Sequence, residues 1–298
     1  RLRRHVAEAA DLRDRAISLY EDAARHAGRE PEARQSPVAW WQDTDDRNAQ
    51  IRKGEAVSIQ KRIDAHGETI AGLQELTLYG LKGAAAYADH ARVLGHEDAA
   101  LYARFHEALA RLAEEPTDAE ELTKRALGAG EINLRAMELL DAANTGTYGH
   151  PEPTQARVTP VAGKAICVSG HDLEDLGDLL EQTQGTGIHV YTHGEMLPCL
   201  AYPEMKKYDH LVGNYGGAWQ DQRQEFDAFP GAILMTTNCI QKPKDSYKDR
   251  IFTSGPTAWP GVKHIADRDF TPVIEAALAA PGFAEDAEAH YTMTGFAH

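Results

Sequence analysis

Three side chains that can bind a metal ion each follow a predicted β-strand. His171, Glu195 and Cys239 come shortly after runs rich in β-branched residues. These runs cover residues 165–169, 188–191 and 232–236. Because ligands of an open parallel sheet collect outside the carboxyl ends of its strands, we expect the three side chains to lie close together. Imidazole, carboxylate and thiolate together suit iron or zinc, whereas calcium and magnesium prefer oxygen ligands alone.

Each of the three residues also has an interpretation without a metal. A histidine after a strand is often only a neighbour of a helix N-cap, and a glutamate that opens a helix is often only a partner of the helix dipole. A lone buried cysteine is usually a small hydrophobic residue. Placement of all three at strand ends favours one shared site over three separate structural roles.

Other reactive side chains are weaker candidates. Cys167 lies inside a predicted strand, so we interpret it as a core residue, and a packing role is also favoured for Cys199. His193 and Asp172 flank the candidate ligands and could hydrogen-bond to them. The glycine loop at residues 214–217 either approaches a ligand with its backbone or is only a tight turn.

The composition argues against several kinds of partner. A formal net charge of −15 over 298 residues disfavours nucleic acids and anionic membranes, which attract basic surfaces. No apolar run approaches the roughly 20 residues of a membrane helix, and no signal-peptide pattern opens the sequence. The three cysteines have no paired spacing, which disfavours disulfides and favours a reducing compartment. We therefore expect a cytoplasmic protein without nucleic-acid or membrane partners.

The first half of the sequence predicts helices only. Apolar residues recur at helical spacing in four segments. These segments are residues 6–24, 70–94, 98–113 and 117–143. We expect the first to face a core, and the second to be central because it is apolar on most sides. Thr117 and Glu120 form a capping-box pattern, residues 28–54 are predicted as a long surface connection, and the glycines of the second helix predict close approach of another backbone.

The second half alternates strands with a helical pattern at residues 173–182. Such alternation indicates right-handed βαβ crossovers and a parallel sheet covered on both faces. The predicted fold is therefore α then α/β: an all-α helical bundle domain over residues 1–160, followed by a Rossmann-like parallel-sheet domain over residues 161–298 that carries the candidate ligands.

Several long motifs, in order and spacing, resemble the hybrid-cluster protein (prismane) family, whose members are called hydroxylamine reductases. In the second half they are residues 169–173, 190–198, 213–217, 233–239 and 259–262. Residues 78–87 and 140–149 resemble the family's helical domain. The resemblance covers about residues 70 to 270, and residues 254–258 depart from the family pattern.

This resemblance implies an enzyme built around an Fe-S-O hybrid cluster. His171, Glu195 and Cys239 match family ligands, so they are expected to bind both the cofactor and its metal, and no catalytic residue is expected beyond them. The implied reaction is the reduction of hydroxylamine to ammonia, and nitric oxide is an alternative substrate. The implied partners are these small molecules and an electron-donor protein.

The sequence also departs from the family. The family's N-terminal cysteine motif holds a second iron-sulfur cluster, but no cysteine precedes Cys167. The remaining hybrid-cluster ligands are expected downstream of Phe296, and the natural N-terminus upstream of Arg1. We therefore expect the 298-residue segment alone to lack an intact cluster and activity. Two alternatives remain: a remnant or interaction module that lost the cluster, and a mononuclear zinc or iron hydrolase using the same three residues.

Overall fold

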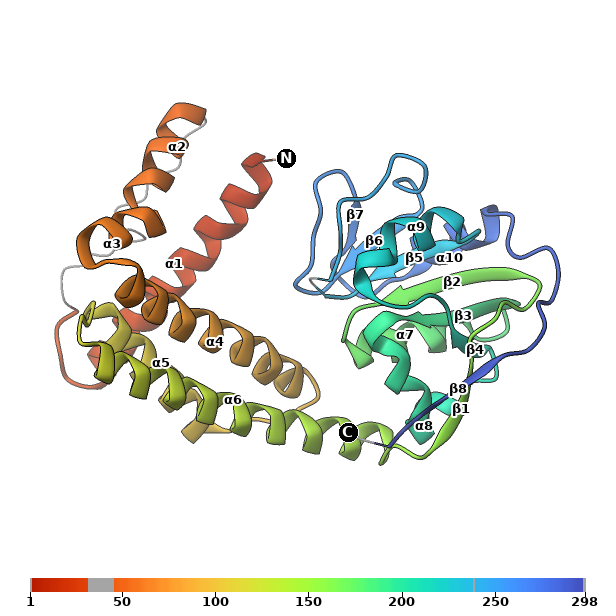
Figure 1. The fold of residues 1–298 in the computed structure, drawn as a ribbon, viewed down its shortest axis with the longest axis horizontal. Coiled ribbons are helices and arrows are strands. Elements are labelled where there is room, and N and C mark those ends of the chain that lie inside the picture. The colour runs from red at the N-terminus through yellow and green to blue at the C-terminus, as the bar shows by residue number, and fades with distance from the viewer. Residues whose placement is uncertain (1, 32–45, 238, 297–298) are drawn as a thin grey trace. The chain divides into compact units, whose positions relative to one another are not determined.

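The computed structural model describes residues 2–31, 46–237 and 239–296, without the side chains of residues 2–10 and 12. Its first half is helical, followed by strands that alternate with helices (Figure 1). The helices of the first half are α1 (Leu2–His26), α2 (Arg47–Ala56), α3 (Ile59–His66), α4 (Glu68–Val93), α5 (Ala99–Ala113) and α6 (Ala119–Tyr148). The predicted order of α then α/β is confirmed.

The four predicted helices correspond to α1, α4, α5 and α6. The surface connection predicted between the first two of them is wrong in part. Residues 47–56 of that connection form α2, which Asp46 caps by accepting a hydrogen bond from the Asn48 N–H. Such an Asx cap overrides the loop-like composition around it. Pro37, Trp40 and Trp41, on which the prediction also rested, lie outside the described residues.

The predicted ends of α6 are also corrected. Asp118, not Thr117, supplies the N-terminal cap, because its carboxylate accepts the Glu121 N–H at 2.7 Å. The helix continues through Tyr148, so the predicted break after residue 143 is absent from α6. Gly149, at φ +81°, marks the end. A left-handed glycine is the usual way to end a helix.

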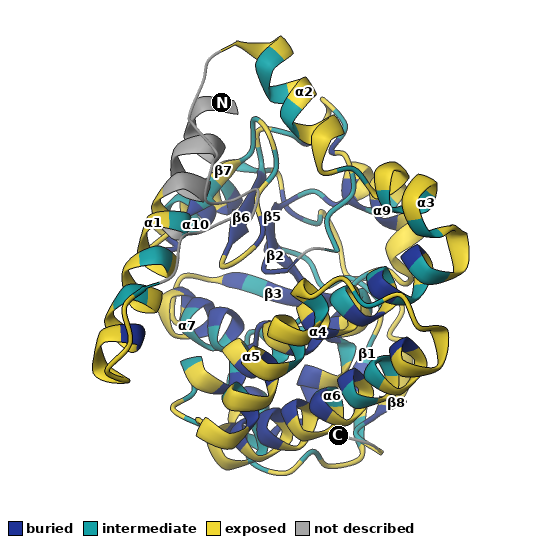
Figure 2. Cartoon of the chain, turned by 90° about the vertical axis from the view of Figure 1, so that its left-hand side faces the viewer, coloured by how far each residue is buried: buried dark blue, intermediate teal, exposed yellow. Residues whose placement is uncertain are grey.

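The burial predicted for two helices is wrong. Among the described side chains of α1, Ala24 alone is buried, and Leu19 is 68% exposed. Helix α4 is not central, since Leu76 and Tyr79 are 61% and 58% exposed. A helical pattern of apolar residues shows that a face exists but not what covers it. Figure 2 shows much of α1 in the yellow of exposed residues.

The glycines of α4 do not mark a tight approach of another backbone. A Cβ added at Gly80 would meet the Cβ of Ala129 at 3.7 Å, an ordinary contact, and one at Gly83 would meet nothing within 4 Å.

The chain divides into two compact units. Residues 1–79 with 109–127 form one, and residues 80–108 with 128–298 form the other. In the first unit, the Gln74 amide nitrogen donates to the Pro116 carbonyl at 2.8 Å. In the second, the C-terminal part of α4 packs with α5 and α6 through a cluster that includes Leu81, Leu101 and Ile132. The predicted boundary between residues 160 and 161 stays a prediction.

A six-stranded parallel sheet forms the centre of the α/β segment. Its strands are β2 (Lys164–Ser169), β3 (Ile188–His193), β4 (Leu211–Asn214), β5 (Ala232–Met235), β6 (Ile251–Ser254) and β7 (Lys263–Ile265). They lie in the order β4-β3-β2-β5-β6-β7. Counted along the chain from β2, this is the 3-2-1-4-5-6 order of the Rossmann fold. The predicted Rossmann-like sheet is therefore confirmed.

Both faces of the sheet are covered, as predicted. Alternate residues of β2 point to opposite faces, so Ile166 and Val168 join one apolar cluster while Cys167 joins the other. Helices α7 (Leu173–Thr183) and α10 (Thr271–Ala279) cover the first face, and α9 (Gln222–Ala228) covers the second. In Figure 2 the central strands are dark blue, the colour of buried residues.

Smaller elements complete the segment. Strand β1 (Thr154–Arg157) pairs antiparallel with β8 (Tyr291–Thr294), and these two strands form a separate ribbon. The short helices η1 (Gly194–Ala201), a 3₁₀-helix, and α8 (Pro203–Lys206) follow β3, and a further short 3₁₀-helix, η2 (Trp219–Asp221), precedes α9. Within the described residues, no helix is both long enough and apolar enough to cross a membrane.

Candidate metal centre

The three candidate ligands meet where the strand order reverses. Strand β2 lies between β3 and β5, so the carboxyl ends of these strands are neighbours. His171 lies just beyond β2, Glu195 is in the first turn of η1 directly after β3, and Cys239 follows β5. This is the topological switch point at which open α/β sheets bind their ligands. The sequence-based expectation of one shared edge thus agrees with the positions of all three residues.

The donor atoms of these residues form a compact group. One ligand atom from each residue lies within 4.8 Å of the others. His171 Nε2 is 2.6 Å from Glu195 Oε2, and Cys239 Sγ is 3.6 Å from His171 Nδ1 and 3.8 Å from Glu195 Oε2. The side chains of His171 and Glu195 are 31% and 63% exposed, so the group is open to solvent. Nitrogen, oxygen and sulfur donors are therefore available together at the protein surface.

A glycine after β2 and another after β3 let the backbone turn toward the site. Gly170 has φ +122°, and a Cβ there would lie 2.3 Å from Thr236 Oγ1 and 2.8 Å from the Thr237 backbone nitrogen. Gly194 has φ +60°, and its Cβ would lie 3.1 Å from the Gly217 carbonyl oxygen. Only glycine combines this conformation with so close an approach. Each of these glycines precedes a candidate ligand directly.

Thr237 orients the imidazole of His171, a role that sequence reasoning missed. Its hydroxyl lies 2.8 Å from His171 Nδ1, while Nε2 on the opposite side of the ring faces Glu195. Because the carboxylate can only accept, Nε2 carries a hydrogen, while Nδ1 faces both the Thr237 hydroxyl and Cys239 Sγ. The hydrogen bond to Cys239 and the negative charges of Cys239 and Glu195 raise the pKa of His171, although burial opposes them.

Gln222 at the start of α9 holds the loop that carries Cys239. The amide group of Gln222 donates to the Cys239 carbonyl at 3.1 Å and accepts the Gln241 N–H at 2.8 Å. Gln222 itself is 1% exposed, and both hydrogen bonds are partly buried. No local sequence pattern predicts this contact, because Gln222 and the loop of Cys239 are separated along the chain.

Two predicted neighbours of the site have other roles. Asp172 is the N-cap of α7 and accepts from the N–H groups of Glu174 and Asp175. His193 is 1% exposed and hydrogen-bonds to Ser169 and Glu225. Burial lowers the pKa of His193, and the hydrogen bond and charge of Glu225 oppose this shift.

The glycine loop at residues 214–217 is a turn tied to its own neighbours. The amide nitrogen of Asn214 donates to the Gly216 carbonyl at 2.9 Å, and the N–H of Gly217 donates to Glu225 Oε1 at 2.8 Å. The tight-turn interpretation is therefore the one that the geometry supports.

The other two thiols are packed in apolar clusters. Cys167 is completely buried among residues such as Phe226, and Cys199 is 5% exposed beside Tyr202. Burial raises the pKa of both thiols, which keeps them protonated. Cys239 is the described cysteine that lies with other metal-binding side chains.

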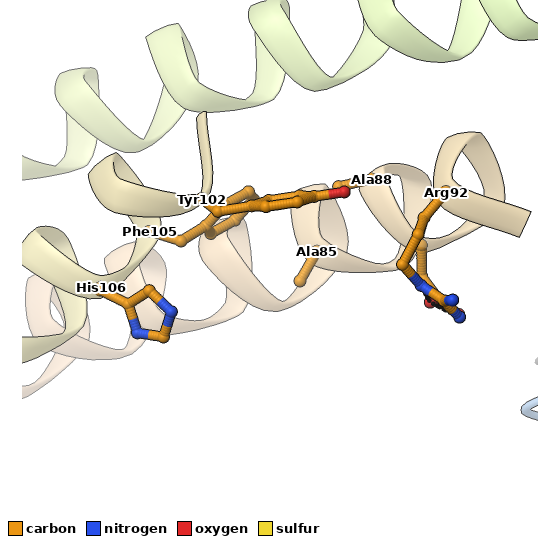
Figure 3. Close-up of a pocket in the computed structure, with 7 residues that line it drawn as sticks. Ala85, Ala88, Arg92, Tyr102, Phe105 and His106 are labelled. Carbon is orange, nitrogen blue, oxygen red and sulfur yellow. Dashed lines mark hydrogen bonds and ion pairs between the residues drawn. The ribbon is translucent and has the colours of Figure 1, made fainter. Parts of the chain in front are cut away.

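A surface pocket of about 240 Å³ lies elsewhere, between α4 and α5. Figure 3 shows the rings of Tyr102 and Phe105 beside Ala85 and Ala88, with His106 and Arg92 at its two ends. None of the three candidate ligands lines this pocket. The candidate site is located by its donor chemistry at the sheet edge.

Comparison with known proteins identifies the family. A model of the prismane/CO dehydrogenase family matches residues 1–292. The chain belongs to this family. The resemblance found in the sequence is thereby confirmed.

Curated relatives of this prismane-family chain carry the name hydroxylamine reductase. Those from Burkholderia lata and Rhodospirillum rubrum are each 54% identical to it, over 97% and 100% of this chain and 52% and 54% of their own lengths. The one from Thermodesulfovibrio yellowstonii is 58% identical over 86% of this chain and 48% of its own length. The chain thus spans about half the length of the curated relatives it matches.

One solved structure also aligns with the prismane-family chain. It is described as NiZn[Fe4S4] and NiNi[Fe4S4] clusters in the α subunits of acetyl-CoA synthase/carbon monoxide dehydrogenase. The alignment covers 93% of this chain and 42% of the solved chain, with 16% sequence identity and a TM-score of 0.46. That likeness is too weak to carry an argument about the site.

The residues at the sheet edge fit an iron-containing group. Iron accepts thiolate, imidazole and carboxylate ligands in mixed sites, and iron-sulfur clusters are held chiefly by cysteine thiolates. The exposed side chains of His171 and Glu195 leave one side of the donor group open. Three donors of this kind suit part of a cluster's ligand set.

Proposed function

We propose that the complete protein is a hydroxylamine reductase whose Fe-S-O hybrid cluster is held in part by His171, Glu195 and Cys239. The observation that carries this proposal is the group of nitrogen, oxygen and sulfur donors within 4.8 Å at the switch point of the sheet. Supporting it, relatives that are 54–58% identical bear the name hydroxylamine reductase.

The proposed reaction breaks the nitrogen–oxygen bond of hydroxylamine. Two electrons and two protons are taken up, and ammonia and water are released. When bound, the cluster would supply electrons and Lewis-acidic iron for this reaction. In the chain itself, the His171 imidazole, the Glu195 carboxylate and the Cys239 thiolate bind the cluster, and the Thr237 hydroxyl orients the imidazole through Nδ1.

The further partners follow from the same proposal. A separate electron-donor protein supplies the electrons, and nitric oxide is a second small-molecule substrate. The formal net charge of −15 supports the absence of a nucleic-acid partner. Unpaired free thiols support a cytoplasmic location, where thiols stay reduced.

The direct test compares Cys239→Ser with Cys199→Ala in the complete protein. We expect Cys239→Ser to lose most of its iron, its cluster EPR signal and its hydroxylamine turnover, because serine replaces the thiolate ligand. Cys199→Ala, which changes a packed thiol, should keep all three. Unchanged iron and EPR signal in Cys239→Ser would refute the ligand assignment. The proposal places only part of the ligand set in these 298 residues, so four irons together with turnover in the isolated polypeptide would also contradict it.

A mononuclear zinc or iron hydrolase is the second candidate. One ligand atom from each of the three residues lies within 4.8 Å of the others, which also suits ligands of a single ion. X-ray absorption at the iron and zinc edges of the purified complete protein distinguishes the two candidates. Iron with a sulfide shell supports the reductase, whereas one zinc per chain without sulfide supports the hydrolase.

A further inference from the structure

The residues that precede two of the ligands are paired across the sheet. Ser169 at the end of β2 and His193 at the end of β3 are register partners. A glycine with positive φ follows each of them, and then the ligand, His171 in one strand and Glu195 in the other. The Ser169 hydroxyl lies 3.0 Å from His193 Nδ1. One buried hydrogen bond therefore joins the two strand ends directly before the glycine turns.

The other nitrogen of the His193 ring is bound to α9. His193 Nε2 lies 2.8 Å from Glu225 Oε2. Because the carboxylate can only accept, Nε2 carries the hydrogen and Nδ1 accepts from Ser169. The ring also packs on Phe226, with the ring centroids 4.8 Å apart. Both nitrogens and one face of the ring are thus occupied, and the ring has a single orientation.

Glu225 extends the connection to the turn beside Glu195. Its second carboxylate oxygen accepts the Gly217 N–H at 2.8 Å. The Gly217 carbonyl in turn lies close to Gly194, where an added Cβ would be 3.1 Å away. Gly216 is packed so tightly that an added Cβ would lie 2.6 Å from Glu225 Oε2. The backbone before Glu195 therefore packs closely against a turn that Glu225 fixes.

Helix α9 reaches the third ligand through Gln222. Gln222 and Glu225 are three residues apart, so they share one face of the helix. Gln222 binds the backbone on both sides of residue 240, at the Cys239 carbonyl and the Gln241 N–H. A single helix thus contacts the strand ends of His171 and Glu195 through His193, and the loop of Cys239 directly.

We propose that His193 and Gln222 are positioning residues that fix the three ligands of the metal centre through α9 without binding the metal. This inference rests on the ligand set of the proposed function. A site must hold its ligands to within about 0.5 Å, and partners behind the ligands typically affect metal affinity or activity about 10- to 100-fold. Both residues are 1% exposed and lie directly behind the ligands.

The test uses His193→Phe in the complete protein, because phenylalanine keeps the packing on Phe226 and removes both hydrogen bonds. We expect a changed or lost cluster EPR signal and a kcat about 10- to 100-fold lower. His193→Gln, which can restore hydrogen bonding, should return the EPR signal toward that of the wild type. His189→Phe is the matched control on the same strand, because His189 Nδ1 has no hydrogen-bond partner in the described part of the chain, and it should leave the signal unchanged.

Gln222→Met tests the second contact, and it provides an independent measurement if His193→Phe does not fold. Methionine has a similar volume but no amide group, so the EPR signal should change while the melting temperature falls only modestly. Wild-type signals in both His193→Phe and Gln222→Met would overturn the proposal. So would an equal change in His189→Phe, or the absence of any rescue by His193→Gln.

The failure of this inference is distinguishable from failure of the proposed function. Cys239→Ser tests the ligand set independently of His193. If Cys239→Ser keeps its iron, the ligand set is wrong whatever His193→Phe does. If Cys239→Ser loses its iron and both positioning variants keep the wild-type signal, only the positioning role is wrong.

Discussion

Two histidine–glutamate pairs lie at the carboxyl edge of the sheet, and they differ in solvent exposure and in the groups around them. His171 and Glu195 are 2.6 Å apart with side chains 31% and 63% exposed. His193 and Glu225 are 2.8 Å apart with side chains 1% and 22% exposed. The first pair lies beside the thiol of Cys239. In the second pair, His193 also contacts the Ser169 hydroxyl and Glu225 also accepts the Gly217 N–H.

This difference shows how a binding pair can be told from a structural one. A buried polar group is stable only when its hydrogen bonds are satisfied, and the His193–Glu225 pair meets that demand. The His171–Glu195 pair is exposed, so solvent could satisfy it without any partner. Folding therefore does not require this pair to lie close to Cys239. Metal binding does, because the three side chains together form a set of metal donors.

The largest expected difference between the pairs is in metal binding. Glu195→Gln in the complete protein should lose most of its iron, because a neutral amide is a poor iron ligand. Its free energy of unfolding without metal should change by less than about 0.5 kcal/mol, as for other exposed positions.

Glu225→Gln is the matched variant, and its pattern should be the reverse. It should keep more of its iron than Glu195→Gln, with an altered EPR signal like that of His193→Phe, and lose about 1–3 kcal/mol of stability, since the buried His193 loses a hydrogen bond to a charged acceptor. Iron analysis and urea unfolding of both variants measure this. The distinction between the pairs is wrong if Glu225→Gln loses as much iron as Glu195→Gln.

The sequence predicts the sheet edge well because the signals there are local. Short apolar runs of β-branched residues define β2, β3 and β5, and the rule that parallel strands end at one edge brings His171, Glu195 and Cys239 together. The turns between strand and ligand were not predicted; the structure shows them at Gly170 and Gly194, whose positive φ other residues avoid.

Contacts between distant segments leave no such signal. Gln222 and Glu225 look like ordinary polar residues of a surface helix, and only the packing of α9 places them behind the ligands. Strands β4, β6 and β7 have three or four residues each and mix apolar with polar residues or glycine, whereas the equally short β5 is wholly apolar and was predicted. The exposure of α1 was also hidden, because amphipathic spacing gives no information about the partner of an apolar face.

A smaller effect tests how tightly the structural pair is enclosed. Gly216→Ala should cost about 1–3 kcal/mol of stability, because φ is +76° and the new Cβ would press on Glu225 and on His193. Gly217→Ala is the control next to it, since its Cβ would meet Glu225 Oε1 at an ordinary 3.8 Å. Thermal unfolding of the two variants gives the comparison. Equal destabilisation would mean that the enclosure of the pair does not depend on Gly216.

The smallest effect concerns Cys167, a thiol on the strand that leads to His171. Its side chain is completely buried between the sheet and α9, so Cys167→Ala leaves a small cavity and should cost about 1 kcal/mol. Because its side chain points into the apolar face that holds Phe226, iron content and EPR signal should stay unchanged. Urea unfolding and iron analysis of the complete protein measure both quantities. A loss of iron would show that packing beneath β2 also sets the ligand geometry. The exposed donor group would then depend on the buried core around it.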